Sequence, residues 1–182
     1  ALFNERDKLT TKAVFGETNK NEEKLGKGVY RQFAKGAQGF NLTSCQFALH
    51  YFFESTHTLE GFLTNVAECT KLGGYFIGGC YDGALIFNDL LAKSPGESLM
   101  IVKDEVKMWE VTKEYNKDTF PPDINSLGYA VNVYQESINK TFKEYLVNFE
   151  YLIRVMENFG FIPLPNDEAR AIGLKRGIGS FN

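Results

Sequence analysis

The sequence predicts an α/β fold, with a mostly parallel sheet in a β-α-β-α unit followed by antiparallel strands and a helix. Helical spacing in "HTLEGFLTNVAECTKLGG" lies between two short apolar stretches, which is typical of a β-α-β unit. From residue 97 onward, apolar and polar residues partly alternate, which is typical of antiparallel strands. The 182 residues, 43% of them hydrophobic, suit one domain with a real core. We therefore expect a single domain over 1–182, divided into 1–39, 40–95 and 98–165.

The first half of this pattern can be assigned element by element. Residues 1–39 form a polar lead-in, and Phe40–Phe47 is predicted to be a strand that begins after Gly39. A helix is expected over Leu59–Leu72, with Gly73 as the residue after its C-cap. A buried strand should follow over Gly74–Gly79.

The order of these elements predicts where a ligand would bind. A right-handed crossover makes the two strands adjacent and parallel, so their carboxyl ends share one sheet edge. The loops Gln46–Tyr51 and Gly78–Tyr81 should then face one crevice. Asp82 is expected to cap a helix over "GALIFNDLLA".

The second half predicts strands in "ESLMIVKD", "VKMWEVTKEY" and "LGYAVNVYQES", paired antiparallel. The run "FKEYLVNFEYLIRVMENFGF" is interpreted as one helix that ends at Gly160. Its apolar face would comprise Leu146, Phe149, Leu152, Ile153 and Met156.

Composition excludes several classes of protein. A net charge of −3 argues against a protein that coats nucleic acid non-specifically, and no apolar run is long enough for a membrane span. Cys45, Cys69 and Cys80 are odd in number, which favours reduced thiols in an intracellular protein. His50 and His57 have no metal-ligand spacing with these cysteines, so no metal is expected. The start "ALFNERDKLTTK" has no initiator Met or signal peptide, which suggests an internal fragment.

Three ordered blocks carry a resemblance to a known family. "SCQFALHYFFES" resembles the Gln-Phe-x-x-His-Tyr-x-Phe-Glu-Ser motif of the messenger-RNA cap guanine-N7 methyltransferases. "LGGYFIGGCYDG" resembles their Gly-Gly-x-Phe-Ile-Gly strand and loop, and "YAVNVYQESINKTFKEYLVNFEYLIRVMENFGF" resembles their late strand and helix. The lead-in is most similar to capping enzymes of large DNA viruses.

The resemblance implies a Rossmann-like class I methyltransferase fold that uses S-adenosylmethionine and no metal. The family's first donor-binding motif and its ribose-binding carboxylate would precede Ala1, so the N-terminal part of the fold is expected to be missing. Asn41 stands where the family usually has Asp. The 182 residues alone should therefore bind S-adenosylmethionine weakly or not at all, which calorimetry would test. Tight binding by this chain would contradict the assignment of the donor site.

The resemblance also implies roles for five side chains. Gln46 and Phe47 would lie against the adenosine end of the donor, Tyr51 between donor and guanine, and His50 against the cap. Glu144 would accept hydrogen bonds from the guanine edge. All five would position the reactants, and none would act as an acid, base or nucleophile.

For each assignment, a purely structural role without a ligand stays open. His50 and Tyr51 could be a satisfied polar pair at a strand end, and Glu144 could be an exposed carboxylate in a first helical turn. Tyr81 is either a donor-side contact or a cover for the sheet, and Trp109 is more often core than a stacking platform.

The predicted function is methyl transfer from S-adenosylmethionine to N7 of the guanine that caps messenger RNA. The alternative is a non-catalytic Rossmann-like subunit or fragment that supports a capping complex. The expected partners are 5′ capped RNA and either other capping-enzyme domains or a stimulatory subunit, without a membrane. The expected location is the cytoplasm, that of the host if the protein is viral.

Overall fold

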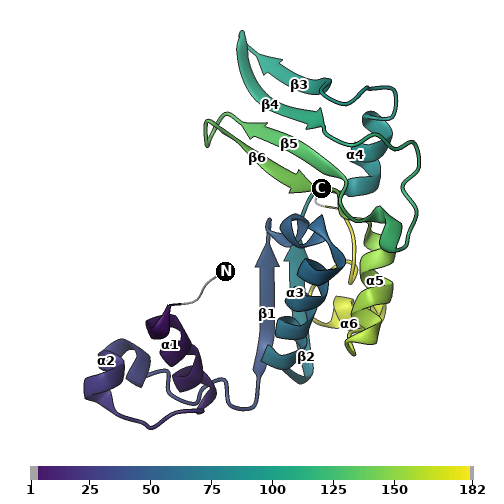
Figure 1. Ribbon diagram of the computed structural model, residues 1–182. Coiled ribbons are helices and arrows are strands. Elements are labelled where there is room, and N and C mark those ends of the chain that lie inside the picture. Colours follow the sequence, from purple (N-terminus) through teal and green to yellow (C-terminus); the bar gives the residue numbers. More distant parts are fainter. Residues whose placement is uncertain (1–3, 181–182) are drawn as a thin grey trace. The chain divides into compact units, whose positions relative to one another are not determined.

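The computed structural model describes residues 4–180 and shows a mixed α/β chain with fourteen elements (Figure 1). The helices are α1 Glu5–Phe15, α2 Glu22–Tyr30, α3 Thr56–Cys69, α4 Gly83–Asp89, α5 Phe149–Asn158 and α6 Asn166–Ala171, with 3-10 helices η1 Leu49–Glu54 and η2 Ile124–Ser126. The strands are β1 Phe40–Gln46, β2 Thr70–Gly79, β3 Ser98–Lys103, β4 Val106–Lys113, β5 Ala130–Gln135 and β6 Lys140–Tyr145.

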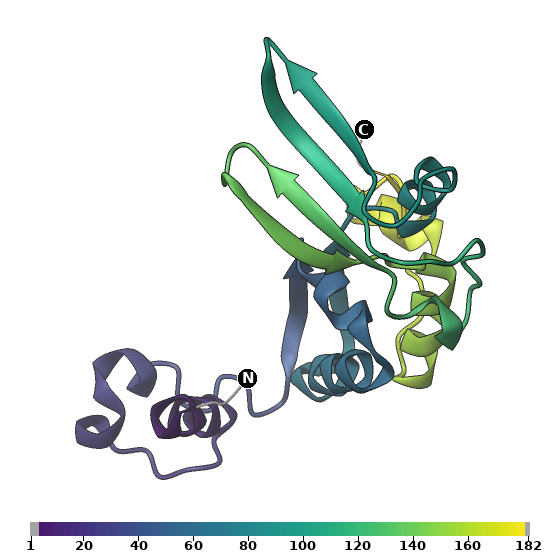
Figure 2. The same cartoon turned by 45° about the horizontal axis from the view of Figure 1, so that its top comes forward.

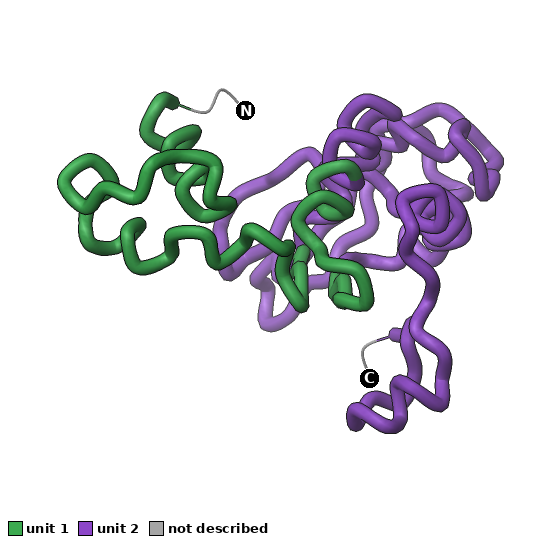
Figure 3. The backbone as a smooth tube through the Cα atoms, turned by 90° about the horizontal axis from the view of Figure 1, so that it is seen from below, with its two compact units in different colours: residues 1–45, 64–78 green, residues 46–63, 79–182 purple. Residues whose placement is uncertain are grey.

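The chain forms two compact units (Figure 3). One comprises residues up to 45 together with 64–78, and the other comprises 46–63 together with the residues from 79 onward. The first unit holds the two N-terminal helices and most of β1 and β2. The second unit holds η1 and the four remaining strands.

The lead-in contains two helices that the sequence interpretation missed. The side chains of Asn4 and Asn21 accept hydrogen bonds from Asp7 N and Lys24 N, so each asparagine caps a helix whose first turn is acidic. Gly16, at φ 78°, ends α1 in the left-handed conformation. These caps were the available signal, because each helix buries only one residue, Ala13 in α1 and Leu25 in α2.

Strands β1 and β2 pair in a two-stranded sheet, as predicted. A Cβ added to Gly74 would meet Phe40 O, and one added to Gly78 would meet Cys45 O. Because both sets of residues advance in the same direction, the strands are parallel, and Figure 1 shows their arrows pointing the same way. The β-α-β prediction is confirmed.

Helix α3 ends three residues earlier than predicted, at Cys69 instead of Leu72. The hydroxyl of Thr70 contacts that of Thr43 on β1 at 2.8 Å, and Thr70 already belongs to β2. Gly73 does have a left-handed φ of 75°, but it lies within β2 and does not end the helix. Pairing with β1 therefore overrides the local helix-stop signal.

The four later strands form a separate antiparallel sheet in the order β3-β4-β5-β6, made of two hairpins (Figure 2). The antiparallel pairing was predicted, although these strands do not extend the β1–β2 sheet. Helix α4 packs on one face, where Phe87 and Leu90 join a core cluster with Val111, Val131 and Val133. Asp82 caps α4 as predicted, accepting from Ala84 N at 2.9 Å.

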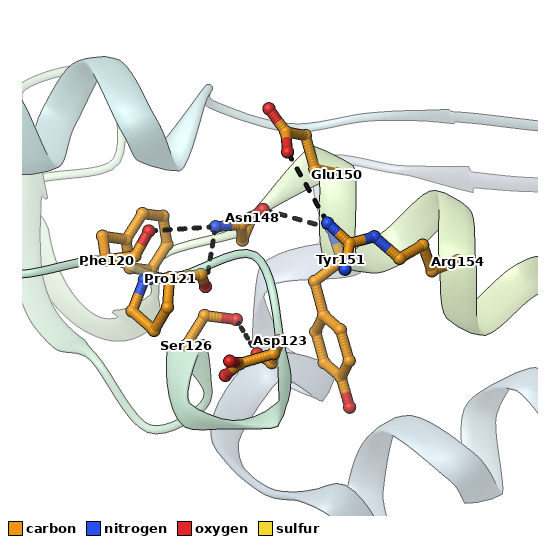
Figure 4. A network of polar contacts seen from close by, with 8 residues as sticks. All are labelled: Phe120, Pro121, Asp123, Ser126, Asn148, Glu150, Tyr151 and Arg154. Atoms are coloured by element: carbon orange, nitrogen blue, oxygen red, sulfur yellow. Dashed lines mark hydrogen bonds and ion pairs between the residues drawn. The ribbon is translucent and has the colours of Figure 1, made fainter.

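The helix predicted from residue 142 is wrong over residues 142–148. Residues Lys140–Tyr145 form β6, which pairs with β5 over its whole length, and α5 begins only at Phe149. Asn148 caps α5 by accepting from Tyr151 N, and its amide donates to Phe120 O and Pro121 O at 3.4 and 3.1 Å (Figure 4). One side chain thus starts the helix and fixes the loop that follows β4.

Candidate functional site

The site is built on the turn that follows β1. Phe47 has a φ of 51°, a left-handed conformation that costs a non-glycine residue about 1 kcal/mol or more. Its N–H donates to Gly79 O at 2.7 Å, so the turn after β1 is joined to the carboxyl end of β2. The two loops therefore meet as predicted, and the chain continues directly into η1.

His50 and Glu144 form the centre of the site. His50 lies on η1 and Glu144 on β6, and their exposed fractions are 6% and 8%. His50 Nε2 lies 3.6 Å from Glu144 Oε2, which is too long for a hydrogen bond. Among the described residues neither ring nitrogen of His50 has a hydrogen-bond partner. The site thus holds a buried imidazole whose hydrogen-bonding capacity is not used, next to a buried carboxyl.

The burial of this pair changes both pKa values. Burial raises the pKa of Glu144 from 4.5 to about 7, because a charged carboxylate loses its hydration there. Burial also lowers the pKa of His50, since the imidazolium form is disfavoured for the same reason. At neutral pH the site therefore holds a neutral imidazole beside a carboxyl that gains or loses its proton easily.

Both side chains line a small cavity between β5, β6 and α4. Its volume is about 10 Å³, room for about one water molecule. The complete lining consists of His50, Tyr81, Gly83, Ile86, Val131, Val133, Glu144, Tyr145, Leu146 and Val147. The cavity is too small for any group larger than a water molecule.

The structure brings Tyr51 to this pair. Its ring packs edge-on against His50, with centroids 4.2 Å apart, while 43% of the side chain stays exposed. Burial and the nearby Glu144 carboxylate raise the pKa of Tyr51, so the phenol keeps its proton. Gln46 and Phe47 lie on the same segment, just before η1, and Phe47 is 62% exposed. Tyr51 is thus partly exposed beside the buried pair, and Phe47 is exposed four residues earlier in the chain.

The geometry bears on the explanations without a ligand that the sequence left open. Glu144 is not an exposed first-turn carboxylate, because it lies buried on a strand. His50 and Tyr51 are not a satisfied polar pair, since the imidazole nitrogens lack partners. Tyr81 lines the cavity beside Glu144, and Trp109 packs partly buried against the core.

One structural contact of the site was missed by sequence reasoning. Tyr145 donates a hydrogen bond to Glu54 Oε1 at 2.7 Å, which joins β6 to the end of η1. Burial of the phenol, with a further contribution from this bond, raises the pKa of Tyr145 to about 12. Because Tyr145 follows Glu144 and Glu54 lies four residues after His50, the bond holds the two sides of the pair together. The available signal was the position of Glu54 within the quoted "HYFFES" segment.

A close backbone approach fixes the opposite side of the cavity. Gly83 N donates to Val147 O at 3.2 Å, and any Cβ at position 83 would collide with the backbone of Val147. Only glycine permits this contact. Helix α4 is thereby tied to the segment that follows Glu144.

A parallel β-α-β unit, with polar and aromatic side chains gathered just beyond the strand ends, defines a ligand-binding domain of the Rossmann-like class. The profile of the mRNA (guanine-N(7))-methyltransferase domain matches residues 4–165, and the chain belongs to this family.

Curated relatives carry corresponding names. The chain is 32% identical over 120 residues to an mRNA cap guanine-N(7) methyltransferase of Drosophila melanogaster, covering 66% of this chain and 26% of that protein. It is 28% identical over 129 residues to the enzyme of the same name in Schizosaccharomyces pombe, covering 66% and 32%. Identity to a probable mRNA-capping enzyme of Acanthamoeba polyphaga mimivirus is 29% over 116 residues, covering 62% and 10%. The chain thus spans at most a third of the length of these relatives.

Two further properties concern the described part of the chain. Within residues 4–180 no helix is long and apolar enough to cross a membrane. Over the same residues, no three His, Cys, Asp or Glu side chains are grouped so that they could hold a metal ion.

Proposed function

We propose that these residues form the cap-binding part of an enzyme that transfers a methyl group from S-adenosylmethionine to N7 of the guanine that caps messenger RNA. The single observation that carries this proposal is the buried imidazole of His50, whose two ring nitrogens have no hydrogen-bond partner among the described residues, beside the buried carboxyl of Glu144. A scaffold without a ligand gains nothing from leaving such groups unpaired, because each costs about 1–3 kcal/mol.

Guanine suits this pair chemically. Its N1–H and its exocyclic amine are two donors on one edge, and a carboxylate such as Glu144 accepts both. These bonds favour the ionised carboxylate, so binding guanine would bring the pKa of Glu144 down again. Adenine has no donor at N1, so it would leave one carboxylate oxygen unpaired.

The reaction needs alignment and no proton transfer. The N7 lone pair attacks the methyl carbon, the carbon–sulfur bond breaks, and sulfur leaves with the bonding electrons as a neutral thioether. The positive charge moves from sulfur to the guanine ring. An ionised Glu144 beside that ring stabilises the developing charge, while His50 and Tyr51 hold its orientation.

We assign the donor to the segment before η1. The exposed ring of Phe47 and the amide of Gln46 would contact its adenosine part, and Tyr51 would lie between donor and guanine. The left-handed turn at Phe47 supports this assignment, because backbone strain of this kind is concentrated at functional sites.

The same proposal covers partners and location. We infer that the capped 5′ end of an RNA is the acceptor and that these residues work beside other capping-enzyme domains or a stimulatory subunit, in the cytoplasm. The name of the mimivirus relative, of which the chain covers a tenth, supports the first of these partners. We also infer that the 182 residues are one part of a single methyltransferase domain.

The proposal is tested with caps that differ only at the guanine edge. The full-length protein is incubated with radiolabelled S-adenosylmethionine and RNA capped with guanosine, inosine or adenosine. Inosine lacks the exocyclic amine, so its kcat/KM should fall at least tenfold, and adenosine-capped RNA should not react. Equal rates with guanosine and inosine caps would refute the guanine contact of Glu144, and absence of methyl transfer to all three would refute the function.

A further inference from the structure

The face of the antiparallel sheet that carries Glu144 continues beyond the cavity with aromatic side chains. Across β5 and β6, Glu144 pairs with Val131 and Phe142 with Val133. Directly opposed residues share a face, so Phe142 lies on the same face as Glu144, two residues nearer the hairpin turn. The valines are 2% exposed, whereas Phe142 is 39% exposed. The sheet face therefore opens to solvent at Phe142.

Tyr81 connects the cavity with the next part of this face. It lines the cavity together with Glu144, and it is 38% exposed. Its hydroxyl accepts a hydrogen bond from Gln135 Nε2 at 3.0 Å, and its ring centroid lies 6.3 Å from that of Trp109. Gln135 pairs with Trp109 across β4 and β5, so these side chains occupy the same face as Phe142. We call Tyr81, Trp109 and Phe142 the aromatic platform.

We propose that the aromatic platform stacks the bases of the first transcribed nucleotides of the capped RNA. This inference rests on the proposed function, because an RNA held by its cap at Glu144 must leave the cavity over a neighbouring surface. Stacking on aromatic rings accepts every base, which suits a transcript whose first nucleotides vary. Lys140 is exposed and lies opposite Gln135 at the outer end of the platform, where its charge complements a phosphate.

The net charge of −3 is compatible with this occupant. Rings that hold only a few nucleotides beside the cap add affinity without a large basic surface, and selection for the 5′ end comes from the cap. A protein partner on the same face is the competing interpretation, and the experiment distinguishes the two.

The test compares a substrate that reaches the platform with one that does not. The full-length protein and its Phe142→Ala variant are assayed with a guanosine-capped decanucleotide and with GTP as an acceptor without a transcript. We expect kcat/KM for the capped RNA to fall about tenfold and kcat/KM for GTP to stay within twofold. Phe142→Trp should keep the parental kcat/KM for the capped RNA, because tryptophan also presents an aromatic ring for stacking. Met100→Ala is the matched control, since Met100 is 56% exposed on the opposite face of β3.

Binding supplies a second measurement that does not depend on activity. Fluorescence anisotropy with a 3′-labelled, uncapped single-stranded decanucleotide should show about tenfold weaker binding to Phe142→Ala and parental binding to Met100→Ala. If kcat/KM of Phe142→Ala falls equally for GTP and capped RNA, or falls for neither, base stacking on the aromatic platform is refuted. The surface would then be assigned to a protein partner. A parental protein that methylates neither acceptor would refute the proposed function instead, and the anisotropy result would then decide about the platform.

Discussion

Replacing Glu144 by Gln should make the protein more stable at alkaline pH while impairing its reaction. Burial raises the pKa of Glu144 from 4.5 to about 7 in the folded chain. Between these two pH values the unfolded chain has already released the proton that the folded chain keeps, so raising the pH favours unfolding. Above pH 7 the folded chain carries the full cost of a buried carboxylate.

The size of this effect follows from the shift. A difference of about 2.5 pKa units at roughly 1.4 kcal/mol each gives about 3 kcal/mol. Glu144→Gln removes the charge and keeps the shape, so it should raise the free energy of unfolding at pH 8 by up to about 3 kcal/mol. At pH 4.5 and below, the two proteins should differ by less than about 1 kcal/mol, because Glu144 is then neutral in the folded chain and at most half ionised in the unfolded chain.

Urea unfolding between pH 4.5 and 8 measures this prediction, with Glu150→Gln as the control. Glu150 lies on α5 with 77% of its side chain exposed, so its substitution should change stability by no more than about 0.5 kcal/mol at any pH. In the methylation assay, the kcat/KM of Glu144→Gln for guanosine-capped RNA should fall about ten- to hundredfold, because a charge-assisted hydrogen bond to guanine is lost. Parallel stability curves for parent and Glu144→Gln over this range would refute the burial argument.

The remaining predictions concern the other sides of the site. Tyr51→Ala should weaken both cap and donor binding about tenfold, which titrations with GTP and with S-adenosylmethionine would measure, and an effect on one ligand alone would contradict its place between them. Tyr145→Phe removes the bond to Glu54 and should raise KM for the cap two- to fivefold with kcat nearly unchanged, whereas a structural role would lower stability without a change in KM. Gly83→Ala should lower the free energy of unfolding by about 1–3 kcal/mol in urea, because its Cβ meets the Val147 backbone, and parental stability would show that the contact yields.

The sequence predicts those parts of the fold whose signals are local. The β1–α3–β2 unit follows from helical spacing between two apolar strands, and Asp82 caps α4 because its carboxylate reaches Ala84 N two residues on. The antiparallel pairing of the later strands follows from the partial alternation of apolar and polar residues.

The errors come from contacts between distant residues. Thr70 belongs to a strand because Thr43 on β1 lies beside it, which no helical spacing reveals. Residues 142–145 were assigned to a helix, since the apolar spacing of α5 can be extended backward by chance. Pairing with β5 decides their conformation, and the Asn148 cap marks the true start of the helix.

In the candidate site, too, local features could be predicted from the sequence and contacts between distant residues could not. A single segment contains His50 and Tyr51, so their proximity could be inferred from sequence. The resemblance alone suggested that Glu144 belongs with them. Its burial, and the missing partners of the imidazole nitrogens, depend on how β6 packs against η1. Such properties require the three-dimensional structure.

The backbone contact between Gly83 and Val147 limits which side of the cavity can move. The backbones of Gly83 and Val147 are in direct contact and cannot separate without losing their hydrogen bond. The side of the cavity formed by α4 and the residues after Glu144 is therefore rigid. On the other side, η1 is a short 3-10 helix whose Tyr51 ring is half open to solvent. For the proposed cap guanine to enter a cavity of about 10 Å³, η1 with His50 would have to move while β6 with Glu144 stays in place.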